Sequence, residues 1–373
     1  MRVLAVNAGS SSLKLSVVDS NDRVEDEQQI DGNADPVATL RAFAARAGEV
    51  DAVAHRVVHG GAEIRRATVV DDEVRHQLDA AVALAPLHAP AALALLDAAR
   101  ASIDRPQIVC VDTAFHASIP ELATTYAVPA QWRAWGVRRY GFHGLSYAWA
   151  SRRAAALLDR PADALHVVIA HIGSGVSACA VRDGRSVDTS MGFTPLEGAV
   201  MATRSGTVDP GALLWLQEHH GLTVEAMTSS LEHGSGLVGV CGFSDVRDVE
   251  REAAAGNAAC IKALDVYVHV LSRVIGGLAT SLDRLDALVF TGGVGEHSAL
   301  VRARVCARLS LLGLPDTLLA ADGDAVIGPA RSGPAVVVVT AREDAEMARE
   351  ARQVLGGQGA VRGPATRGSA PDR

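Results

Sequence analysis

Two arginines stand beside glycines, where a chain can turn sharply. Arg56 shortly precedes the pair Gly60-Gly61, and Arg204 stands in Thr203-Arg204-Ser205-Gly206. A planar guanidinium group binds a carboxylate or a phosphate through two parallel hydrogen bonds. The two arginines therefore predict capture of an anion. The alternative, two unpaired surface arginines, stays open on these residues alone.

Two histidines are candidates for work on a phosphoryl group. His143 stands in Tyr140-Gly141-Phe142-His143-Gly144, and His171 comes directly before a glycine loop. Either imidazole could donate a hydrogen bond to a transferring phosphoryl group, although a buried histidine with satisfied hydrogen bonds is the structural alternative. His55 and His59 lie in a strand-like segment, where this spacing separates them by about 13 Å along one face. A zinc site is therefore not supported.

Two carboxylates and one lysine complete the candidates. Asp112 ends an apolar strand-like run, where a carboxylate either caps a helix or serves a function. Glu343 ends Thr340-Ala341-Arg342-Glu343, which fits the capping box S/T-x-x-E and so has a purely structural explanation. Lys14, one of two lysines in the chain, could reach a phosphate or could be an exposed strand lysine.

One strand-loop-strand pattern occurs twice. Residues 3–8 and 167–172 are apolar runs that enter loops of small residues, and second apolar runs follow at 13–18 and 176–181. Each unit predicts a hairpin with a glycine and serine tip. A third apolar segment, 287–296, adds a glycine loop whose backbone N–H groups could approach an anion. Several such loops indicate a nucleotide, and the duplication predicts two similar domains.

Strands alternate with helical patterns along the whole chain, which indicates an α/β protein. A hinge between the two domains is expected near residue 115. The stretch 356–373, rich in Gly, Pro and Ser, predicts a disordered tail. Strands are expected at 51–58, 107–111, 287–290 and 335–339, and helices at 90–100, 145–158, 261–281 and 343–355.

Composition narrows the class of protein. A chain of 373 residues exceeds what one hydrophobic core usually serves. The net charge of −8, with interspersed signs, argues against a nucleic-acid partner. No uncharged apolar run of about 18 residues is present, so no membrane partner and a cytoplasmic location are expected. Five scattered cysteines support neither a disulfide framework nor a zinc knuckle.

Seven segments in order make the chain, from residue 1 to about residue 355, resemble the acetate kinase family. The resemblance implies the actin-like ATPase fold: two duplicated ribonuclease-H-like domains, a nucleotide in the cleft between them, and a homodimer formed largely by the second domain. It places residues 1–115 and 344–355 in the first domain and residues 116–343 in the second. The segments are 6–14, 55–61, 112–116, 141–144, 189–198, 203–210 and 290–298.

The resemblance implies reversible transfer of the γ-phosphate of ATP to acetate, which gives acetyl phosphate and ADP with Mg²⁺, or Mn²⁺, as the metal. Asp112 would accept or donate a proton, and His143 and Arg204 would stabilise the transition state. Arg56 would bind the carboxylate, and Asn7 and Glu343 would hold the metal. The methyl pocket would be Val58, Leu87, Phe142 and Pro195. The nucleotide would contact Lys14, His171, Ile172, Gly173, Ser174, Gly175, Asp245, Val246, Arg247, Gly293, Val294, Gly295, Glu296 and His297.

The chain also departs from the family pattern. Leu145 and Tyr147 stand where the family typically has Thr and His, and Ser174 and His297 replace common Asn residues. Propionate kinase is the nearest rival activity, since one methylene group in an apolar pocket is worth only about 1 to 3 kcal/mol. A non-catalytic ATP switch of the actin or Hsp70 type is the alternative from another class.

Overall fold

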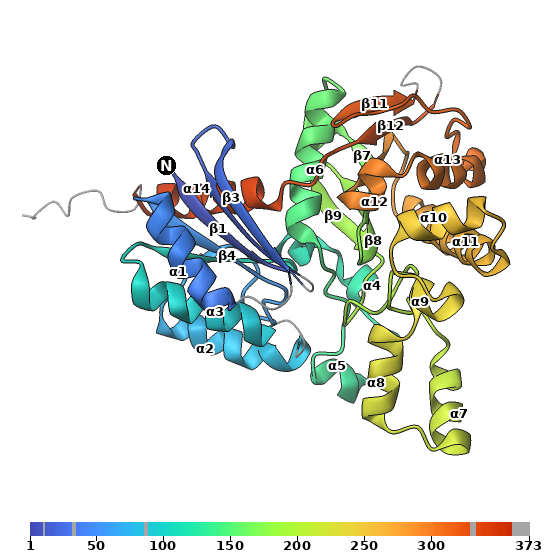
Figure 1. The fold of residues 1–373 in the computed structure, drawn as a ribbon, viewed down its shortest axis with the longest axis horizontal. Helices are drawn as coiled ribbons and strands as arrows, with labels where there is room; N and C mark the ends of the chain where they lie inside the picture. Colours follow the sequence, from blue (N-terminus) through green and yellow to red (C-terminus); the bar gives the residue numbers. More distant parts are fainter. Residues whose placement is uncertain (10–11, 32–34, 86–88, 329–332, 360–373) are drawn as a thin grey trace, which may run out of the picture.

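A computed structural model describes residues 1–9, 12–31, 35–85, 89–328 and 333–359 and contains two six-stranded sheets in this part of the chain (Figure 1). The first sheet has the order β3 (Val24–Asp31), β2 (Ser12–Val18), β1 (Val3–Ala8), β4 (Ala52–Val57), β6 (Gln107–Val111) and β5 (Thr68–Val69). The second has β9 (Arg185–Thr189), β8 (Val176–Arg182), β7 (His166–Ile172), β10 (Ala287–Thr291), β12 (Ala335–Val338) and β11 (Ala325–Gly328).

The two sheets have the same topology. Each begins with an antiparallel hairpin, β1–β2 or β7–β8, to which a third antiparallel strand is added. The first strand of each hairpin then pairs in parallel with β4 or β10, and the next parallel strand is β6 or β12. A short antiparallel strand, β5 or β11, forms the other edge of each sheet. The predicted α/β fold with two duplicated, actin-like halves is confirmed.

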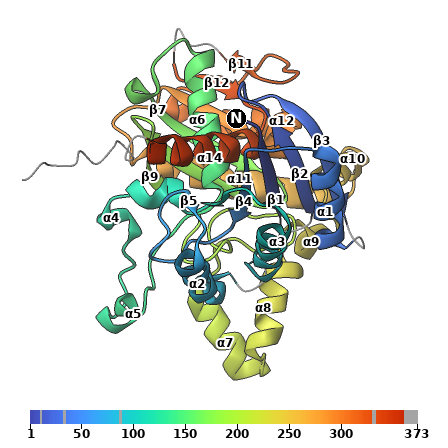
Figure 2. The same cartoon turned by 90° about the vertical axis from the view of Figure 1, so that its left-hand side faces the viewer.

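Helices cover both faces of the first sheet. α1 (Pro36–Ala47) and α3 (Ala89–Ser102) cover one face, where Leu40, Phe43 and Leu95 join the apolar side chains of β1 and β2. α2 (Asp72–Ala81) lies beside them. The last helix, α14 (Glu343–Gly359), covers the other face through Met347, Ala348 and Ala351 (Figure 2). The C-terminal helix therefore returns to the first sheet, as expected.

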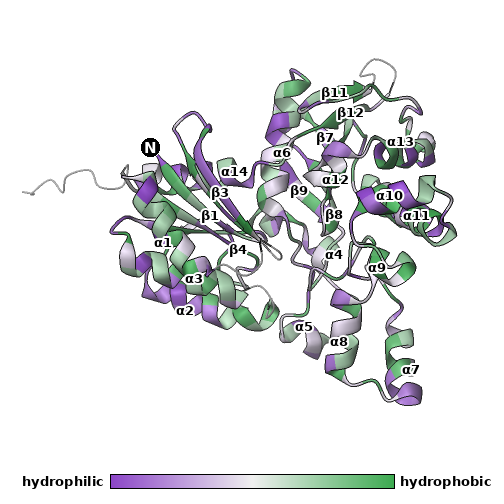
Figure 3. Ribbon diagram, viewed as in Figure 1, coloured by the Kyte–Doolittle hydropathy of each residue, from purple (hydrophilic) through white to green (hydrophobic). Residues whose placement is uncertain are grey.

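The second sheet lies between α11 (Ala258–Ala279) and α6 (Gly144–Leu157). In Figure 3 the inner strands of both sheets are largely apolar, as strands buried on two faces should be, whereas the edge strand β3 is largely hydrophilic. α7 (Pro210–His220) and α8 (Val224–His233) project away from the sheets and contain no buried residue (Figure 1). The other helices are α4 (Glu121–Thr124), α5 (Ala130–Ala134), α9 (Gly236–Cys241), α10 (Val246–Ala254), α12 (Gly292–His297) and α13 (Ala299–Arg308), with 3-10 turns at Val82–Leu84, Ala114–Ser118, Ala162–Ala164 and Ser310–Leu312.

Helix α6 connects the two halves. Its Leu145 belongs to the core of the first sheet, whereas Tyr147 belongs to the core of the second. The Trp149 indole donates a hydrogen bond to the carbonyl of Thr340, 2.9 Å away, just before α14 begins. The predicted hinge near residue 115 falls between β6 and α6. The exact domain limits stay a prediction.

Two expectations about chain segments were wrong in part. The third glycine segment is not an open loop, because β10 passes directly into α12 at Gly292. The predicted tail begins too early, since α14 extends through residues 356–359. Helix propagation adds one backbone hydrogen bond per residue, which outweighs the low propensity of Gly356 and Gly357. Residues 360–373 lie outside the described residues.

The expected strands and helices fit the structure. The expected strands correspond to β4, β6, β10 and β12, and the expected helices to α3, α6, α11 and α14. All five cysteines are free thiols, and Cys110, Cys179, Cys260 and Cys306 are buried. Among the helices in the described ranges, none is long and apolar enough to cross a membrane.

Glu350 on α14 makes stability depend on pH. Burial and the neighbouring Glu346 raise its pKa from 4.5 to about 7, and its buried Oε2 has no hydrogen-bond partner among the described residues. A carboxyl group with a raised folded-state pKa binds more protons in the folded state, so stability falls as pH rises from about 4.5 through about 7. Between these pH values, the free energy of unfolding of Glu350→Gln should therefore fall by roughly 3 kcal/mol less than that of the wild type.

Urea unfolding at pH 5 and pH 8 measures that difference. The exposed Glu121→Gln on α4 is the matched control and should keep the wild-type dependence on pH. An equal fall in stability between the two pH values for wild type and Glu350→Gln would contradict the prediction.

Candidate active site

Arg56 and Asp112 meet at the carboxyl ends of neighbouring parallel strands. Arg56 is near the end of β4, and Asp112 directly follows β6, which pairs with β4. Ligands of open α/β sheets bind at this edge. The Arg56 guanidinium donates from Nε and Nη2 to the Asp112 carboxylate, at 3.0 and 2.7 Å. Asp112 is buried, and its side chain therefore fixes the orientation of Arg56.

Asn7 from β1 and Glu343 from α14 complete the network around Arg56. The Asn7 amide oxygen accepts a hydrogen bond from Arg56 Nη1 at 3.0 Å. The Asn7 amide nitrogen donates a hydrogen bond to Glu343 Oε2 at 2.7 Å. Glu343 also forms an ion pair with Arg56 at 3.3 Å. Since α14 begins at Glu343 itself, this residue is not the third helical position of a capping box.

Burial and charge act together on this network. Burial disfavours the charge of Arg56, but Asp112 and Glu343 outweigh it and raise the pKa of Arg56. Burial raises the pKa of Asp112 even though Arg56 acts in the opposite direction. Burial would also raise the pKa of Glu343, but Arg56 and His171 bring it below the usual value. Arg56 is therefore a permanently charged, oriented cation rather than a surface arginine.

His143 and His171 stack on each other, with ring centroids 4.3 Å apart. His143 precedes α6 in the left-handed backbone conformation, at a φ of 58°, which few residues other than glycine adopt. The next residue must be glycine, because a Cβ at Gly144 would lie 2.2 Å from the Asp112 carbonyl oxygen. Burial, then His171, Arg56 and Arg204, hold the pKa of His143 well below its usual value. Its ring is therefore neutral near pH 7.

The loop Gly173–Gly175 joins β7 to β8 and lies against the segment that carries Arg204. The Ala202 N–H donates to the Ser174 carbonyl oxygen at 3.1 Å. Arg204 Nη1 donates to the Pro195 carbonyl oxygen at 3.0 Å, and its Nε lies 4.0 Å from Glu232. Burial lowers the pKa of Arg204. Like Arg56, Arg204 has a side chain only 12% exposed, so neither is the surface arginine of the alternative interpretation.

These side chains surround a small cavity of about 220 Å³. Its polar groups come from both sheets, and three apolar side chains, Val58, Phe142 and Pro195, lie among them. Most of the predicted substrate-binding and catalytic residues are therefore brought together. The full lining is Gly9, Arg56, Val58, Asp112, Phe142, His143, His171, Gly173, Ser174, Gly175, Pro195, Arg204 and Glu343.

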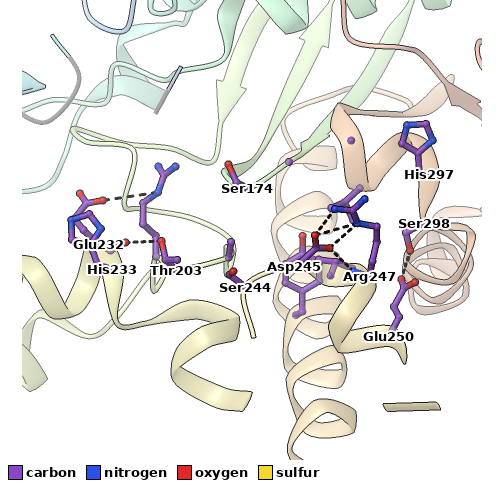
Figure 4. Close-up of a pocket in the computed structure, with 17 residues that line it drawn as sticks. Ser174, Thr203, Glu232, His233, Ser244, Asp245, Arg247, Glu250, His297 and Ser298 are labelled. Atoms are coloured by element: carbon purple, nitrogen blue, oxygen red, sulfur yellow. Dashed lines mark hydrogen bonds and ion pairs between the residues drawn. The ribbon is translucent and has the colours of Figure 1, made fainter. Parts of the chain in front are cut away.

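A larger cavity of about 910 Å³ extends from the same loop over the second half of the protein (Figure 4). Six predicted nucleotide-binding residues line it beyond the loop: Asp245, Val246, Arg247, Gly293, Val294 and His297. Arg247 forms an ion pair with Asp245, and Ser298 donates a hydrogen bond to Glu250 (Figure 4). The volume of this larger cavity suits a ligand much bigger than the small cavity can hold.

The two cavities share Gly173, Ser174 and Arg204. A ligand in the larger cavity can therefore extend one end to the loop, where it would face a ligand held by Arg56. Arg204 and His143 lie at this junction, because a Cβ at Gly175 would be 2.9 Å from Arg204 Nη2 and 3.4 Å from His143 Nε2. The geometry suits transfer of an anionic group between two bound molecules.

Of the predicted site residues that the structure describes, five lie outside both cavities: Asn7, Lys14, Ile172, Gly295 and Glu296. Asn7 acts on Arg56 as described above. Lys14 pairs with Glu27 at 3.2 Å and lies 3.7 Å from Asp344. Glu296 accepts a hydrogen bond from the Ala341 N–H, next to α14. Leu87 lies outside the described residues.

Several residues of the site could not be found from the sequence. Ser177 and Ser146 donate or accept hydrogen bonds at the Nδ1 atoms of His143 and His171, both at 2.8 Å. Nothing in the sequence pairs a serine of one strand with a histidine 34 positions away. The larger cavity also includes Ala202, Thr203, Glu232, His233, Ser244, Glu250, Tyr267 and Ser298.

Gly175 provides a geometric test of the junction. Gly175→Ala places a methyl group against Arg204 and His143, so both side chains must move. We expect kcat for the transfer reaction to fall roughly 100-fold, the effect of losing one well-placed donor. Gly277→Ala in α11, where no atom lies within 4 Å of the added Cβ, is the control and should leave kcat unchanged. Equal kcat values for the two variants would refute the placement of the junction.

Two oxygen donors that contact Arg56 in this structure are of the kinds that bind Mg²⁺. Asn7 offers an amide oxygen and Glu343 a carboxylate, which are the ligands that Mg²⁺ prefers. No group of three or more His, Cys, Asp or Glu side chains among the described residues could form a closed metal cage. Mg²⁺ commonly takes only one or two protein ligands and completes its shell with water and phosphate oxygens.

Comparison with known proteins identifies the family of this chain. An acetate kinase of Deinococcus radiodurans is 38% identical over 96% of this chain and 99% of its own length. The crystal structure of the Porphyromonas gingivalis acetate kinase has a TM-score of 0.86 at 30% identity and covers 95% of this chain and 99% of its own. A propionate kinase from Francisella tularensis has a TM-score of 0.85 at 30% identity, with 94% and 98% covered. The profile of the Acetokinase family matches residues 34–349, and the chain belongs to this family.

Proposed function

We propose that this protein is an acetate kinase, which transfers the γ-phosphate of ATP to acetate and gives acetyl phosphate and ADP, reversibly. The observation that carries the proposal is the junction of the two cavities at Gly173, Ser174 and Arg204. It offers room for a nucleotide on one side and for a small carboxylate beside Arg56 on the other.

Acetate would lie in the small cavity. Its carboxylate would bind Arg56, whose orientation Asp112 and Asn7 hold. Its methyl group would contact Val58, Phe142 and Pro195. The Asp112 side chain is hydrogen-bonded to Arg56 and to the backbone of His143, and acetate needs no deprotonation to act as a nucleophile. An orienting role for Asp112 therefore fits the geometry better than the proton exchange that the resemblance implied.

ATP would occupy the larger cavity with its γ-phosphate at the Gly173–Gly175 loop. An acetate oxygen would attack the γ-phosphorus while the bond to the oxygen that leaves with ADP breaks. Two anions must approach, and Arg56, Arg204 and the neutral His143 supply positive charge and a hydrogen-bond donor at that place. Mg²⁺ held by Asn7 and Glu343 would neutralise phosphate charge.

Closure of the two halves would complete the site. The small cavity is lined by Arg56 and Asp112 from the first sheet and by His171 and Arg204 from the second half. Movement of the halves toward each other would exclude water, which would otherwise compete with acetate for the phosphoryl group. α6, which contributes to the cores of both halves, would carry that movement.

The decisive experiment measures acyl phosphate from MgATP with acetate, propionate or butyrate, trapped with hydroxylamine. Acetate should give the highest kcat/KM. A propionate value well above that for acetate would make the protein a propionate kinase. ATP hydrolysis that no carboxylate alters, with no hydroxamate, would favour the ATP switch and refute the proposal.

We also propose a cytoplasmic homodimer. Five free cysteines are typical of a reducing compartment. Leu214 and Trp215 on α7 and Val224 on α8 are at least half exposed on helices without buried residues. Exposed apolar side chains gathered on projecting helices are typical of protein interfaces. Light scattering on the wild type and on Leu214→Asp would test whether the dimer forms through this surface.

A further inference from the structure

Three polar groups form a buried chain that ends at His143. The Tyr147 hydroxyl of α6 is hydrogen-bonded to Ser177 of β8, and Ser177 Oγ lies 2.8 Å from His143 Nδ1. Tyr147 and Ser177 are both fully buried. Tyr147 is also the residue that departs from the histidine typical of the family at this position. The chain of contacts is therefore a feature of this sequence, and it reaches a residue of the proposed transfer site.

Counting hydrogens fixes the direction of these bonds. Each hydroxyl has one hydrogen, and a neutral imidazole has one hydrogen on only one of its nitrogens. Within the described residues, Tyr147 and Ser177 form side-chain hydrogen bonds only along this chain. If His143 Nδ1 carried the hydrogen, it would donate to Ser177, and either the serine or the tyrosine hydrogen would then be buried without an acceptor. Such an orphaned donor costs free energy.

Only the opposite direction gives both hydroxyl hydrogens of this chain of contacts an acceptor. Tyr147 donates to Ser177, Ser177 donates to His143 Nδ1, and the ring hydrogen is on Nε2. The neutral forms that this count needs agree with the surroundings, because burial raises the pKa of Tyr147 well above its usual value and lowers that of His143. Nε2 faces the glycine loop, where a Cβ at Gly175 would lie 3.4 Å from it.

We propose that Ser177, whose hydroxyl is held by Tyr147, is a positioning residue that keeps the single hydrogen of His143 on Nε2, directed at the phosphoryl position beside Gly173–Gly175. With the hydrogen on Nδ1 instead, Nε2 would present a lone pair to phosphoryl oxygens and repel them. The catalytic consequence rests on the proposed acetate kinase activity. The position of the hydrogen does not.

Nitrogen NMR of histidine-labelled protein reads the position of that hydrogen directly. Long-range proton–nitrogen correlations distinguish the two neutral forms of the ring, and His143→Gln identifies which signals belong to His143. The wild type should carry the hydrogen on Nε2. Ser177→Ala removes the only donor to Nδ1 among the described residues, so both forms should be populated in that variant, with KM for ATP and acetate little changed. In Tyr147→Phe the Ser177 hydrogen still has Nδ1 as its acceptor, so the ring hydrogen should stay on Nε2. Ser177→Ala should lower kcat roughly 100-fold.

Ser186→Ala is the matched control. It removes a serine–histidine hydrogen bond of the same length, 2.8 Å, to the buried His116 outside both cavities. The form of His143 and kcat should both stay as in the wild type. A wild-type hydrogen on Nδ1, or a Ser177→Ala variant with unchanged ring form and kcat, would overturn the proposal. A wild type that forms no acyl phosphate would refute the activity instead, while the NMR result would still decide the ring form.

Discussion

Arg56→Ala should raise KM for acetate by roughly two orders of magnitude, whereas KM for ATP should change far less. Arg56 lines the small cavity and is absent from the lining of the larger one. Its guanidinium is oriented by Asp112 and Asn7 before any ligand arrives, so its removal takes away a prepared cation for the carboxylate. Initial rates at varied acetate with saturating ATP, and the reverse, measure both constants.

The same substitution also leaves Asp112 and Glu343 without their buried cation, which costs stability. Arg56→Lys separates the two effects, because it keeps the charge but loses the planar fork, and it should bind acetate with intermediate KM. Arg152→Ala is the control, because it breaks an ion pair with another buried carboxylate, Glu346, which lies away from both cavities. It should lower the free energy of unfolding without changing KM for acetate. Unchanged acetate KM and kcat in Arg56→Ala would reject the assignment.

Local signals explain why the sheets were predictable from the sequence. Both hairpins have apolar strands joined by short turns of small residues, and these are properties of neighbouring positions. The duplicated topology follows once the hairpins are recognised, because each is the start of the same strand order. Helix ends were less predictable. α12 begins directly at Gly292, and α14 continues past Gly356, because tertiary contacts and helix cooperativity decide these ends rather than propensity.

The site depended on contacts between distant parts of the chain. Asn7 and Glu343 are hydrogen-bonded across 336 positions, and no periodicity connects them. The local pattern around Glu343 even favoured a helix cap, which the structure replaces by contacts to Asn7 and Arg56. The family resemblance named these residues as a set, whereas their geometry needed the fold. The serine partners of the histidines were missed for the same reason.

The loss of Arg204 should have the largest effect on the chemical step. Arg204 lies at the junction of the cavities, where charge develops on the transferring phosphoryl group and where Gly175 leaves room for its Nη2. We expect Arg204→Ala to lower kcat roughly 1,000-fold, as for an arginine that stabilises phosphoryl transfer. KM for acetate should change little, because Arg56 holds the carboxylate. Single-turnover hydroxamate formation measures this step without product release.

Arg204→Lys tests whether charge alone is enough at this junction. Burial already lowers the pKa of Arg204, and a lysine at the same place would lose its proton more readily because its intrinsic pKa is lower. Its residual activity should therefore decline toward alkaline pH, where wild-type activity persists. Arg153→Ala, which removes a partner of Asp324 outside both cavities, should keep the wild-type kcat. A wild-type kcat in Arg204→Ala would mean that the phosphoryl group is transferred elsewhere, because no other arginine lines both cavities in the described parts of the chain.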